Sequence, residues 1–288
     1  MALSYDVFQV APKPIPSSVP GFEEKLGQAT WPPSTSTLIW NEDGGLLIDA
    51  LITQAESELL AKWVVDHGSP LTTIYITHPH ADHFLGLPAV VAAFPDAGVV
   101  ALPGAIAGLQ GQVSPAAMQV WGGFFPSQLT TEPIVPEPLS GTSLAIGDEV
   151  VTLVPVGATD TDNSSIVHVP ALGLVVAGDV VYNRVHMWLA GSTPETRRSW
   201  LKALESVEGL EPATVIAGHR CPDAPDDDAI RQVDESRRYI TSFEAALRES
   251  ATPRDLISQM TEQYPDLGNP YTLWVAAFDL LAPSDAAS

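Results

Sequence analysis

The sequence predicts an α/β (α+β) fold in which two β-sheets pack against each other and helices cover their outer faces. Two strand-rich blocks lie before residue 103 and between residues 143 and 177, and each is joined to segments whose apolar residues recur at helical spacing. Because sheets and helices both have an apolar side to bury, such blocks form packed layers. A hydrophobic content of 45% supplies enough apolar surface for a core, so we expect residues 1–288 to form a single domain.

The N-terminal region contains a proline-rich arm. Six prolines fall within the first 33 residues: Pro12, Pro14, Pro16, Pro20, Pro32 and Pro33. Because proline lacks the backbone N–H donor and fixes φ, residues 11–33 should form an extended, irregular arm between short strands.

The first strand-rich block follows this arm. Residues 37–40 and 46–48 flank a turn at Gly44-Gly45, with Asp43-Gly44 as the turn signal, and are predicted to pair as a hairpin. Residues 53–67 have the apolar spacing of a helix, with a glycine directly after them as a cap. The β-branched residues 71–76 then form a strand that runs into a group of histidines.

The rest of the chain alternates between strands and helices. A helix is expected at residues 84–94, a strand at 98–102 and weak helical character over 104–126. The second block has predicted strands at 143–146, 149–155, 164–169 and 172–177. A helix at 193–206 and a strand at 213–217 precede a mostly helical end, and the tail 282–288 is expected to fray.

Composition narrows the classes of partner. Lys and Arg number 13 against 35 Asp and Glu, which gives a net charge of −22. A surface this acidic repels phosphate backbones and anionic lipid headgroups, so we expect a small-molecule substrate and neither a nucleic acid nor a membrane partner. A homodimer is left open. The single Cys221 excludes an internal disulfide, and the absence of a signal-peptide pattern leads us to expect a cytoplasmic protein.

A dense histidine cluster follows the strand at residues 71–76. Four ligand-type side chains occur within six residues: His78, His80, Asp82 and His83. Imidazole nitrogens and carboxylate oxygens together suit zinc or a similar first-row cation. A loop that turns alternate side chains toward two points would place His78 and His80 on one metal, with Asp82 and His83 on another. Three of the seven histidines lie here, which disfavours an accidental cluster.

The cluster resembles the H-x-H-x-D-H signature of the metallo-β-lactamase-fold hydrolases. The strand that ends in Gly178-Asp179 resembles the family strand whose aspartate bridges two metals, and Gly218-His219 resembles the last strand, whose histidine binds the second metal. These motifs follow the family order. The resemblance implies a four-layer αββα sandwich and up to two zinc ions, with iron or manganese as alternatives.

One ligand of this pattern is missing. Where the family has Gly-His-Thr, this chain has Gly157-Ala158-Thr159, and alanine has no lone pair to offer. The resemblance then leaves the first metal with His78, His80 and Asp179, and the second with Asp82, His83, Asp179 and His219. Three explanations remain: a designed His-to-Ala change, natural loss of the ligand with conversion to a one-metal enzyme, or its replacement by Asp160 or Asp162. We therefore expect an impaired hydrolase.

The resemblance also implies a chemistry: metal-activated water or hydroxide attacks a small ester, lactone or related substrate. The aspartate that matches Asp82 would bind metal and orient that water or carry its proton. His186 is expected to border the cleft and donate to an oxyanion, with Tyr182 nearby. Trp121 and Phe124 are candidates for an apolar substrate wall, or for plain core. A non-catalytic binding or scaffold protein and a β-lactam hydrolase are the alternative functions.

Overall fold

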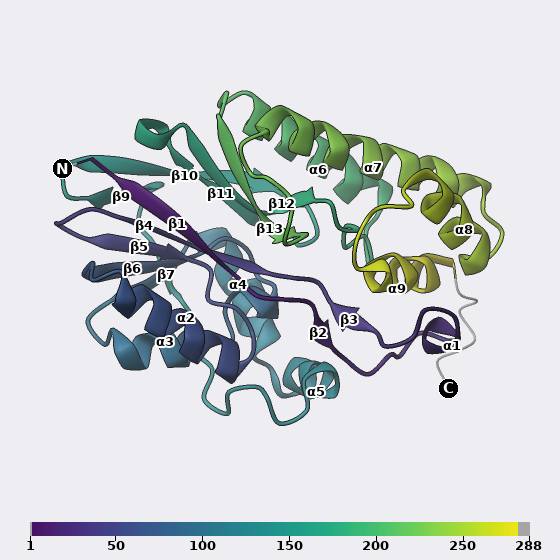
Figure 1. The fold of residues 1–288 in the computed structure, drawn as a ribbon, viewed down its shortest axis with the longest axis horizontal. Helices are drawn as coiled ribbons and strands as arrows, with labels where there is room; N and C mark the ends of the chain where they lie inside the picture. Colours follow the sequence, from purple (N-terminus) through teal and green to yellow (C-terminus); the bar gives the residue numbers. More distant parts are fainter. Residues whose placement is uncertain (1, 282–288) are drawn as a thin grey trace.

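In the computed structural model, which describes residues 2–281, two sheets lie face to face between two sets of helices (Figure 1). The expected four-layer αββα arrangement is confirmed. The tail 282–288, for which we expected fraying, lies outside the described residues.

The first sheet has six strands in the order β1-β4-β5-β6-β7-β8. Its members are β1 (Ser4–Gln9), β4 (Thr35–Trp40), β5 (Gly45–Ile48), β6 (Leu71–Ile76), β7 (Gly98–Ala101) and β8 (Glu137–Pro138). The expected hairpin is confirmed, because β4 and β5 pair antiparallel with Thr37 opposite Ile48. From β5 to β8 the strands are parallel, so their carboxyl ends meet at one edge.

The second sheet has five strands in the order β13-β12-β11-β10-β9. Its members are β9 (Ser143–Ile146), β10 (Glu149–Gly157), β11 (Ser164–Val169), β12 (Leu174–Asn183) and β13 (Thr214–Arg220). Strands β12 and β13 are parallel, and β12 runs several residues beyond the strand expected to end at residue 177. This longer strand carries Asp179 and Tyr182 into the interior.

Alternating burial shows how the sheets pack. On β5, Leu46 and Ile48 belong to a core cluster shared with the second sheet, while Leu47 belongs to the cluster under the helices. On β12, Val176 belongs to the cluster between the two sheets, and Val175 belongs to the cluster under the helices. Because side chains along a strand alternate between faces, each sheet buries one face against the other sheet and one against helices.

Helices α2 (Gln54–Asp66), α3 (Leu87–Ala93), α4 (Pro103–Gln112) and α5 (Pro115–Phe124) lie on the side of the first sheet (Figure 1). Thr53 caps α2 by accepting the N–H of Glu56, and Gly68 follows its end at φ 69°, as the sequence predicts. Helix α3 begins three residues later than expected, with Pro88 in its first turn, and a separate 3₁₀ turn, Ala81–His83, places the histidines before it.

The second sheet is covered by α6 (Pro194–Glu208) and α7 (Ala229–Glu249), followed by α8 (Pro253–Gln263) and α9 (Pro270–Leu281) (Figure 1). Helices α6 and α7 both contact β12. Within the described part of the chain, no helix is both long and apolar enough to cross a membrane.

The proline-rich arm is more ordered than the sequence predicts. It contains the short strands β2 (Lys13–Pro14) and β3 (Thr30–Trp31), which pair with each other, and the five-residue helix α1 (Phe22–Leu26) between them. No proline interrupts residues 21–31, and Phe22 is buried with its ring against Tyr271 and Trp274 of α9. The arm therefore packs along the molecule and brings Trp31 to the site described next.

Candidate metal centre

Three segments far apart in the sequence meet at one point between the two sheets. The loop after β6 carries His78 and His80 and then tightens into the turn Ala81–His83, which the His83 N–H closes on the His80 carbonyl. Strand β12 contributes Asp179 and strand β13 contributes His219. The Nε2 atom of His219 lies 3.3 Å from Asp82 Oδ2, so the last strand and the histidine loop converge as expected.

Two glycines make this approach possible. A Cβ on Gly218 would lie 2.2 Å from Asp179 Oδ1, and a Cβ on Gly178 would lie 2.8 Å from Thr77 Oγ1. Gly178 also has φ 50°, a conformation that glycine adopts without the strain of a side chain. The glycines before Asp179 and His219 are therefore required by the packing of the site.

Asp179 occupies the centre of the cluster. Its Oδ1 lies 3.2 Å from His83 Nε2, and its Oδ2 lies 3.2 Å from His219 Nε2 and 3.9 Å from His78 Nε2. The hydroxyl of Tyr182 also donates a hydrogen bond of 2.7 Å to Oδ2. One carboxylate therefore faces both halves of the histidine loop.

The first donor group contains a carboxylate where the family resemblance left a gap. Donor atoms of four residues lie within 4.8 Å of one another: His78, His80, Asp160 and Asp179. Asp160 Oδ2 lies 2.7 Å from His80 Nδ1, and the Asp160 side chain is fully buried. Asp162, by contrast, is exposed. Of the three explanations for Ala158, this geometry favours replacement of the ligand by Asp160, because the loop after β10 folds the Asp160 carboxylate toward His78 and His80.

The second donor group is Asp82, His83 and His219, whose donor atoms also lie within 4.8 Å of one another. Each of these residues is also held by a hydrogen bond to a residue outside the group, in the case of Asp82 on the same Oδ2 atom that lies 3.3 Å from His219 Nε2. Trp31 Nε1 donates to Asp82 Oδ2 over 2.8 Å, His83 Nδ1 pairs with Asp49 Oδ2 over 2.8 Å, and His219 Nδ1 lies 3.1 Å from the carbonyl of Pro33. Such outer contacts orient metal ligands.

Asp49 and Trp31 are functional candidates that the sequence reasoning missed. Asp49 directly follows β5 and accepts the N–H and hydroxyl of Thr77, so it fixes the start of the histidine loop. A signal for Asp49 exists: it is a carboxylate directly after a predicted strand, which one predicted helix joins to the strand before the histidines. The local sequence contains no such signal for Trp31, because only the packing of the arm brings its side chain to Asp82.

The donor set fits a cation. Within residues 2–281, four buried atoms of the cluster have no hydrogen bond of regular geometry: Nε2 of His78, Nε2 of His83, Oδ2 of Asp160 and Oδ1 of Asp179. Their near contacts are with other donors of the cluster, at 2.7 Å between Asp160 Oδ2 and His80 Nδ1 and 3.2 Å between Asp179 Oδ1 and His83 Nε2. A buried polar atom without a partner costs free energy, and a cation coordinated between these atoms would satisfy all four. Imidazole and carboxylate donors together are the ligands that zinc and related divalent metals bind.

The charges of the cluster also suit a bound cation. Burial alone would raise the pKa of Asp160, but the neighbouring His78 and His80 lower it below its ordinary value. Burial opposes protonation of His219, yet Asp179 and Asp82 raise its pKa to about 9. The carboxylates stay ionised, as metal ligands must be, and the histidine protons are the positive charge that a metal ion would displace.

A cavity of about 20 Å³ lies over the donors. Trp31, Trp121, Trp188 and Tyr182 help to line it. Trp121 packs edge-on against Trp31 with ring centroids 5.5 Å apart. Phe124, the other expected wall residue, contacts Trp31 at 5.6 Å but does not line the cavity. This volume holds a water molecule and no organic substrate, so the aromatic side chains must move to admit one.

His186 lies elsewhere than expected. It is buried outside the cavity, its Nδ1 is 2.9 Å from the hydroxyl of Tyr239, and its carbonyl accepts the hydroxyl of Thr272. Burial lowers the pKa of His186 to about 4. The backbone after β12 turns away from the donors at Arg184, so this histidine packs against α7 and is not placed to donate to an oxyanion at the centre.

Comparison with known proteins agrees with this geometry. The family model described as "Metallo-beta-lactamase superfamily" matches residues 29–219 of the chain, which include every donor of the two groups. No curated protein matches the chain.

Several solved structures share the fold. A metallo-beta-lactamase family protein from Thermus thermophilus is 18% identical with a TM-score of 0.64, and the match covers 96% of this chain and 91% of that chain. A beta-lactamase domain protein from Burkholderia ambifaria is 17% identical with a TM-score of 0.63, covering 96% and 87%. A metallo-beta-lactamase from Pontibacter korlensis is 19% identical with a TM-score of 0.55, covering 83% and 99%. At these identities the likeness shows the fold alone.

Proposed function

The chain belongs to the metallo-beta-lactamase superfamily, and from this premise we propose that it is a metal-dependent hydrolase of a small ester, lactone or related substrate. The observation that carries the proposal is the buried donor set, in which Asp179 stands between two groups of ligand-type side chains. Retention of so many clustered, buried ligand-type side chains is costly for a protein that uses the fold only as a scaffold.

The two groups would each hold one ion. His78, His80 and Asp160 would hold the first and Asp82, His83 and His219 the second, with Asp179 shared between them. Zinc is the ion we propose, because mixed imidazole and carboxylate donors suit it, although manganese and iron share this ligand preference. Such ions lower the pKa of a water molecule to near neutrality and polarise the substrate carbonyl or phosphoryl oxygen.

Asp82 would orient the attacking water. Burial would raise the pKa of Asp82, but His83 and His219 lower it below the usual range, so the carboxylate is ionised and can accept a hydrogen bond from that water. The Trp31 N–H holds Oδ2 in place, which keeps the group from rotating during the reaction.

Tyr182 takes the role that the sequence suggested for His186. Burial and the nearby Asp179 raise the pKa of Tyr182 far above its ordinary value, so the phenol keeps its proton and serves as a hydrogen-bond donor. It lines the cavity over the donors. On release from Asp179 its hydroxyl would be free to donate to a substrate oxygen at the centre.

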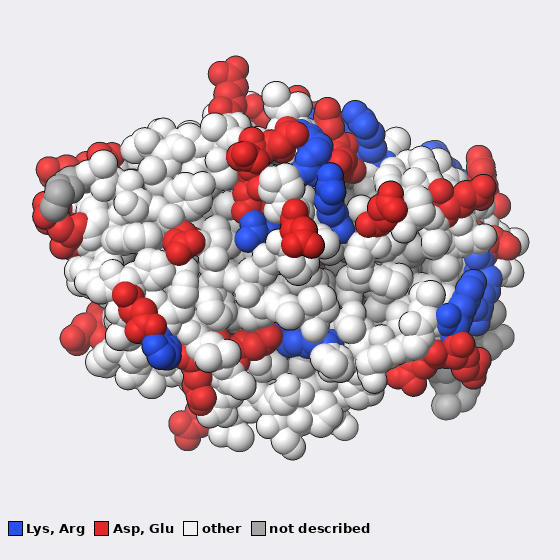
Figure 2. Space-filling view, viewed as in Figure 1, with Lys and Arg blue, Asp and Glu red and all other residues white. Residues whose placement is uncertain are grey.

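The surroundings favour a small neutral substrate. Beside the donors, the cavity is lined mainly by indole and phenol rings, which suit an apolar acyl or alkyl group. On the face shown in Figure 2, acidic side chains are spread widely and the basic ones form only small groups, so this face offers no broad basic surface to a polyanion. A net charge of −22 disfavours nucleic acid in the same way.

The test combines metal analysis with a substrate panel. The chain as given is loaded with zinc, manganese or iron(II), dialysed, and assayed for metal per chain and for hydrolysis of chromogenic esters, lactones and a cephalosporin. We expect about two metals and hydrolysis of an ester or lactone. Absence of both metal and hydrolysis would refute the proposal and favour a scaffold, and hydrolysis of the cephalosporin alone would favour a β-lactam hydrolase.

Three variants examine the loop after β10. We expect Asp160→Ala to lose one metal and most activity, whereas Asp162→Ala, which removes an equal charge from an exposed neighbour, should keep both. Ala158→His should gain no metal. A gain of a metal and of hydrolysis in Ala158→His would show instead that the chain as given lacks its first ligand.

A further inference from the structure

Most donors of the metal centre are closed off from solvent. The side chains of Asp82, His83 and Asp179 are at most 2% exposed, and the cavity of about 20 Å³ over them holds no organic molecule. Any substrate therefore has to displace part of the cover. The aromatic side chains of this cover come from four places in the chain: Trp31 in the arm, Trp121 on α5, Tyr182 on β12 and Trp188 after β12.

The walls at Trp31 and Trp188 are held by the surrounding fold. The Trp31 indole N–H donates to Asp82 Oδ2 over 2.8 Å, and the arm that carries it is anchored by Phe22, which packs on α9. Both sequence neighbours of Trp188 are buried, so its backbone is fixed on either side. Movement of either wall would break these buried contacts.

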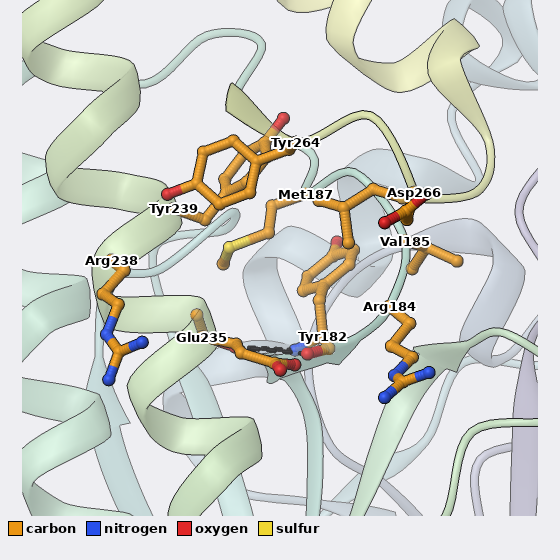
Figure 3. Close-up of a pocket in the computed structure, with 11 residues that line it drawn as sticks. Tyr182, Arg184, Val185, Met187, Glu235, Arg238, Tyr239, Tyr264 and Asp266 are labelled. Carbon is orange, nitrogen blue, oxygen red and sulfur yellow. Dashed lines mark hydrogen bonds between the residues drawn. The ribbon is translucent and has the colours of Figure 1, made fainter. Parts of the chain in front are cut away.

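Tyr182 is held as part of β12. Its N–H donates to Ser236 Oγ over 3.2 Å, and its carbonyl accepts from the same hydroxyl over 3.2 Å (Figure 3). Among the described residues, Tyr182 is the one that lines both the small cavity and the larger cavity of about 330 Å³ shown in Figure 3. The larger cavity is therefore separated from the donors by a wall whose main chain is held in place.

Helix α5 is attached more lightly than these three walls. Trp121 is its one buried residue, and the rest of the helix is half-buried or exposed. The nearest fully buried side chains along the chain are Leu109 in α4 and Phe125 directly after α5. The Trp121 indole N–H donates to Gln112 Oε1 at the end of α4, over 2.8 Å. Figure 1 shows α5 at the periphery of the fold, so the ring that closes the cavity is carried by a peripheral helix with one buried side chain.

Glycines weaken this part of the chain without a packing reason. Gly111 ends α4, and Gly122 and Gly123 lie in the last turn of α5. A Cβ built at any of the three meets no neighbouring atom within 4 Å, and none of the three has a positive φ. Alanine would therefore fit at each position and make a more stable helix. A weak helical turn beside Trp121 is typical of a lid, because segments that move have low local stability.

We propose that α5 is a lid on the metal centre and that Trp121 is the side chain that closes it. The last turn of α5 unwinds at Gly122 and Gly123, and Trp121 swings out of the cavity while the other three walls stay. Opening costs the burial of one ring and the hydrogen bonds of one helical turn, whereas displacement of another wall would also break an anchor in the core. What enters rests on the proposed function, but the opening itself requires no hydrolysis.

The test strengthens the last turn of α5 in the zinc-loaded full chain with the double variant Gly122→Ala/Gly123→Ala. Amide hydrogen exchange at residues 122–125 should slow about fourfold or more, the product of roughly twofold to fivefold for each glycine replaced. Removal of zinc by the aromatic chelator dipicolinate should slow by the same factor. The kcat/KM for a chromogenic ester should fall equally, with the zinc content unchanged.

The outcomes separate the lid from the proposed function. Slower exchange and slower zinc removal in a protein that hydrolyses no ester would support the lid and refute the hydrolase. If exchange slows while zinc removal and hydrolysis keep their rates, the entrance lies elsewhere and the lid is refuted. Exchange that does not slow would also overturn the proposal, because the last turn would then not be the part that opens.

Two further variants serve as controls. Gly111→Ala adds the same methyl group at an equally open position in α4 and should leave all three rates unchanged. An equal slowing in Gly111→Ala would contradict the assignment of the opening to the last turn of α5. Trp121→Ala removes the closing ring, so zinc removal should become at least about threefold faster, and an unchanged or slower rate would overturn the role of Trp121.

Discussion

The two donor groups of the metal centre are held in place to different degrees. Asp82, His83 and His219 are each oriented from outside by a residue distant in the sequence, namely Trp31, Asp49 and Pro33. In the other group, the ring of His80 faces a fellow donor, Asp160, and Asp160 is supported by the hydroxyl of its neighbour Thr159. The ring of His80 is also 17% exposed, whereas that of His83 is 1% exposed.

This difference has a consequence for metal affinity. A ligand that is already oriented loses less freedom when it binds an ion, and outer hydrogen bonds of this kind change metal affinity by roughly 10–100-fold. We therefore expect the group around His83 to bind its ion more tightly and the group around Asp160 to exchange its ion more readily.

The largest effect is expected at the residue that both groups share. Asp179→Asn removes the charge that faces His78, His83 and His219, so both ions should be lost or weakened and hydrolysis should fall by at least about 100-fold. Metal content and kcat/KM measure this. Asp162→Asn is the control of equal charge change, and retention of two ions in Asp179→Asn would contradict the shared role.

A titration with a competing chelator tests the comparison directly. The chain as given should release its two ions in two steps of different affinity, and Asp160→Ala should abolish the weaker step while it leaves the tighter one. The reason is that Asp160 contacts His78 and His80 and does not contact the second group. Loss of the tighter step in Asp160→Ala would reverse the proposed order.

The outer support of the tighter group is tested at Trp31. Trp31→Phe removes the N–H bonded to Asp82 and keeps an aromatic ring, so the tighter ion should bind roughly 10–100-fold more weakly. The acid limb of the pH profile of kcat/KM should also shift to higher pH. The reason is that an N–H donor favours the ionised carboxylate, so its loss raises the pKa of Asp82. Trp121→Phe is the control: Trp121 packs on Trp31 but donates to Gln112. An equal loss of metal affinity in both variants would show that Trp31 contributes only packing.

The smallest effect on the metal centre is expected from His186, which lies outside both groups. Burial lowers its pKa from 6.5 to about 4, so as the pH falls the unfolded chain takes up this proton first. The stability due to neutral His186 is present above pH 6.5 and is lost between about pH 6.5 and 4, up to about 3 kcal/mol.

Urea unfolding at pH 7 and at pH 4.5 measures this loss. His186→Asn keeps a polar partner for the Tyr239 hydroxyl and should show a smaller drop in unfolding free energy between the two pH values, with metal content unchanged. An identical drop in both proteins would show that the acid sensitivity comes from the donor cluster.

The predicted and observed structures agree best where the signal is local. The strand β6 has the expected bounds, and the Thr53 cap and the glycine after α2 mark that helix as the sequence indicates. They agree least in the arm and in the loop after β10. The register of a family pattern places the gap at Ala158, but spacing along a loop does not set the direction of its side chains, and Asp160 turns inward two residues later.

The sequence by itself determined the chemistry of the centre. The H-x-H-x-D-H run and the two Gly-Asp and Gly-His strand ends specify which residues can be donors, because ligand type is a property of the side chain, and both glycines are required by close contact at the strand ends. Only the tertiary structure decided which residues orient those donors. Trp31, Asp49 and Asp160 act through hydrogen bonds and charge over a few ångströms, and such distances between remote segments exist only once the sheets, the arm and the loops have packed together.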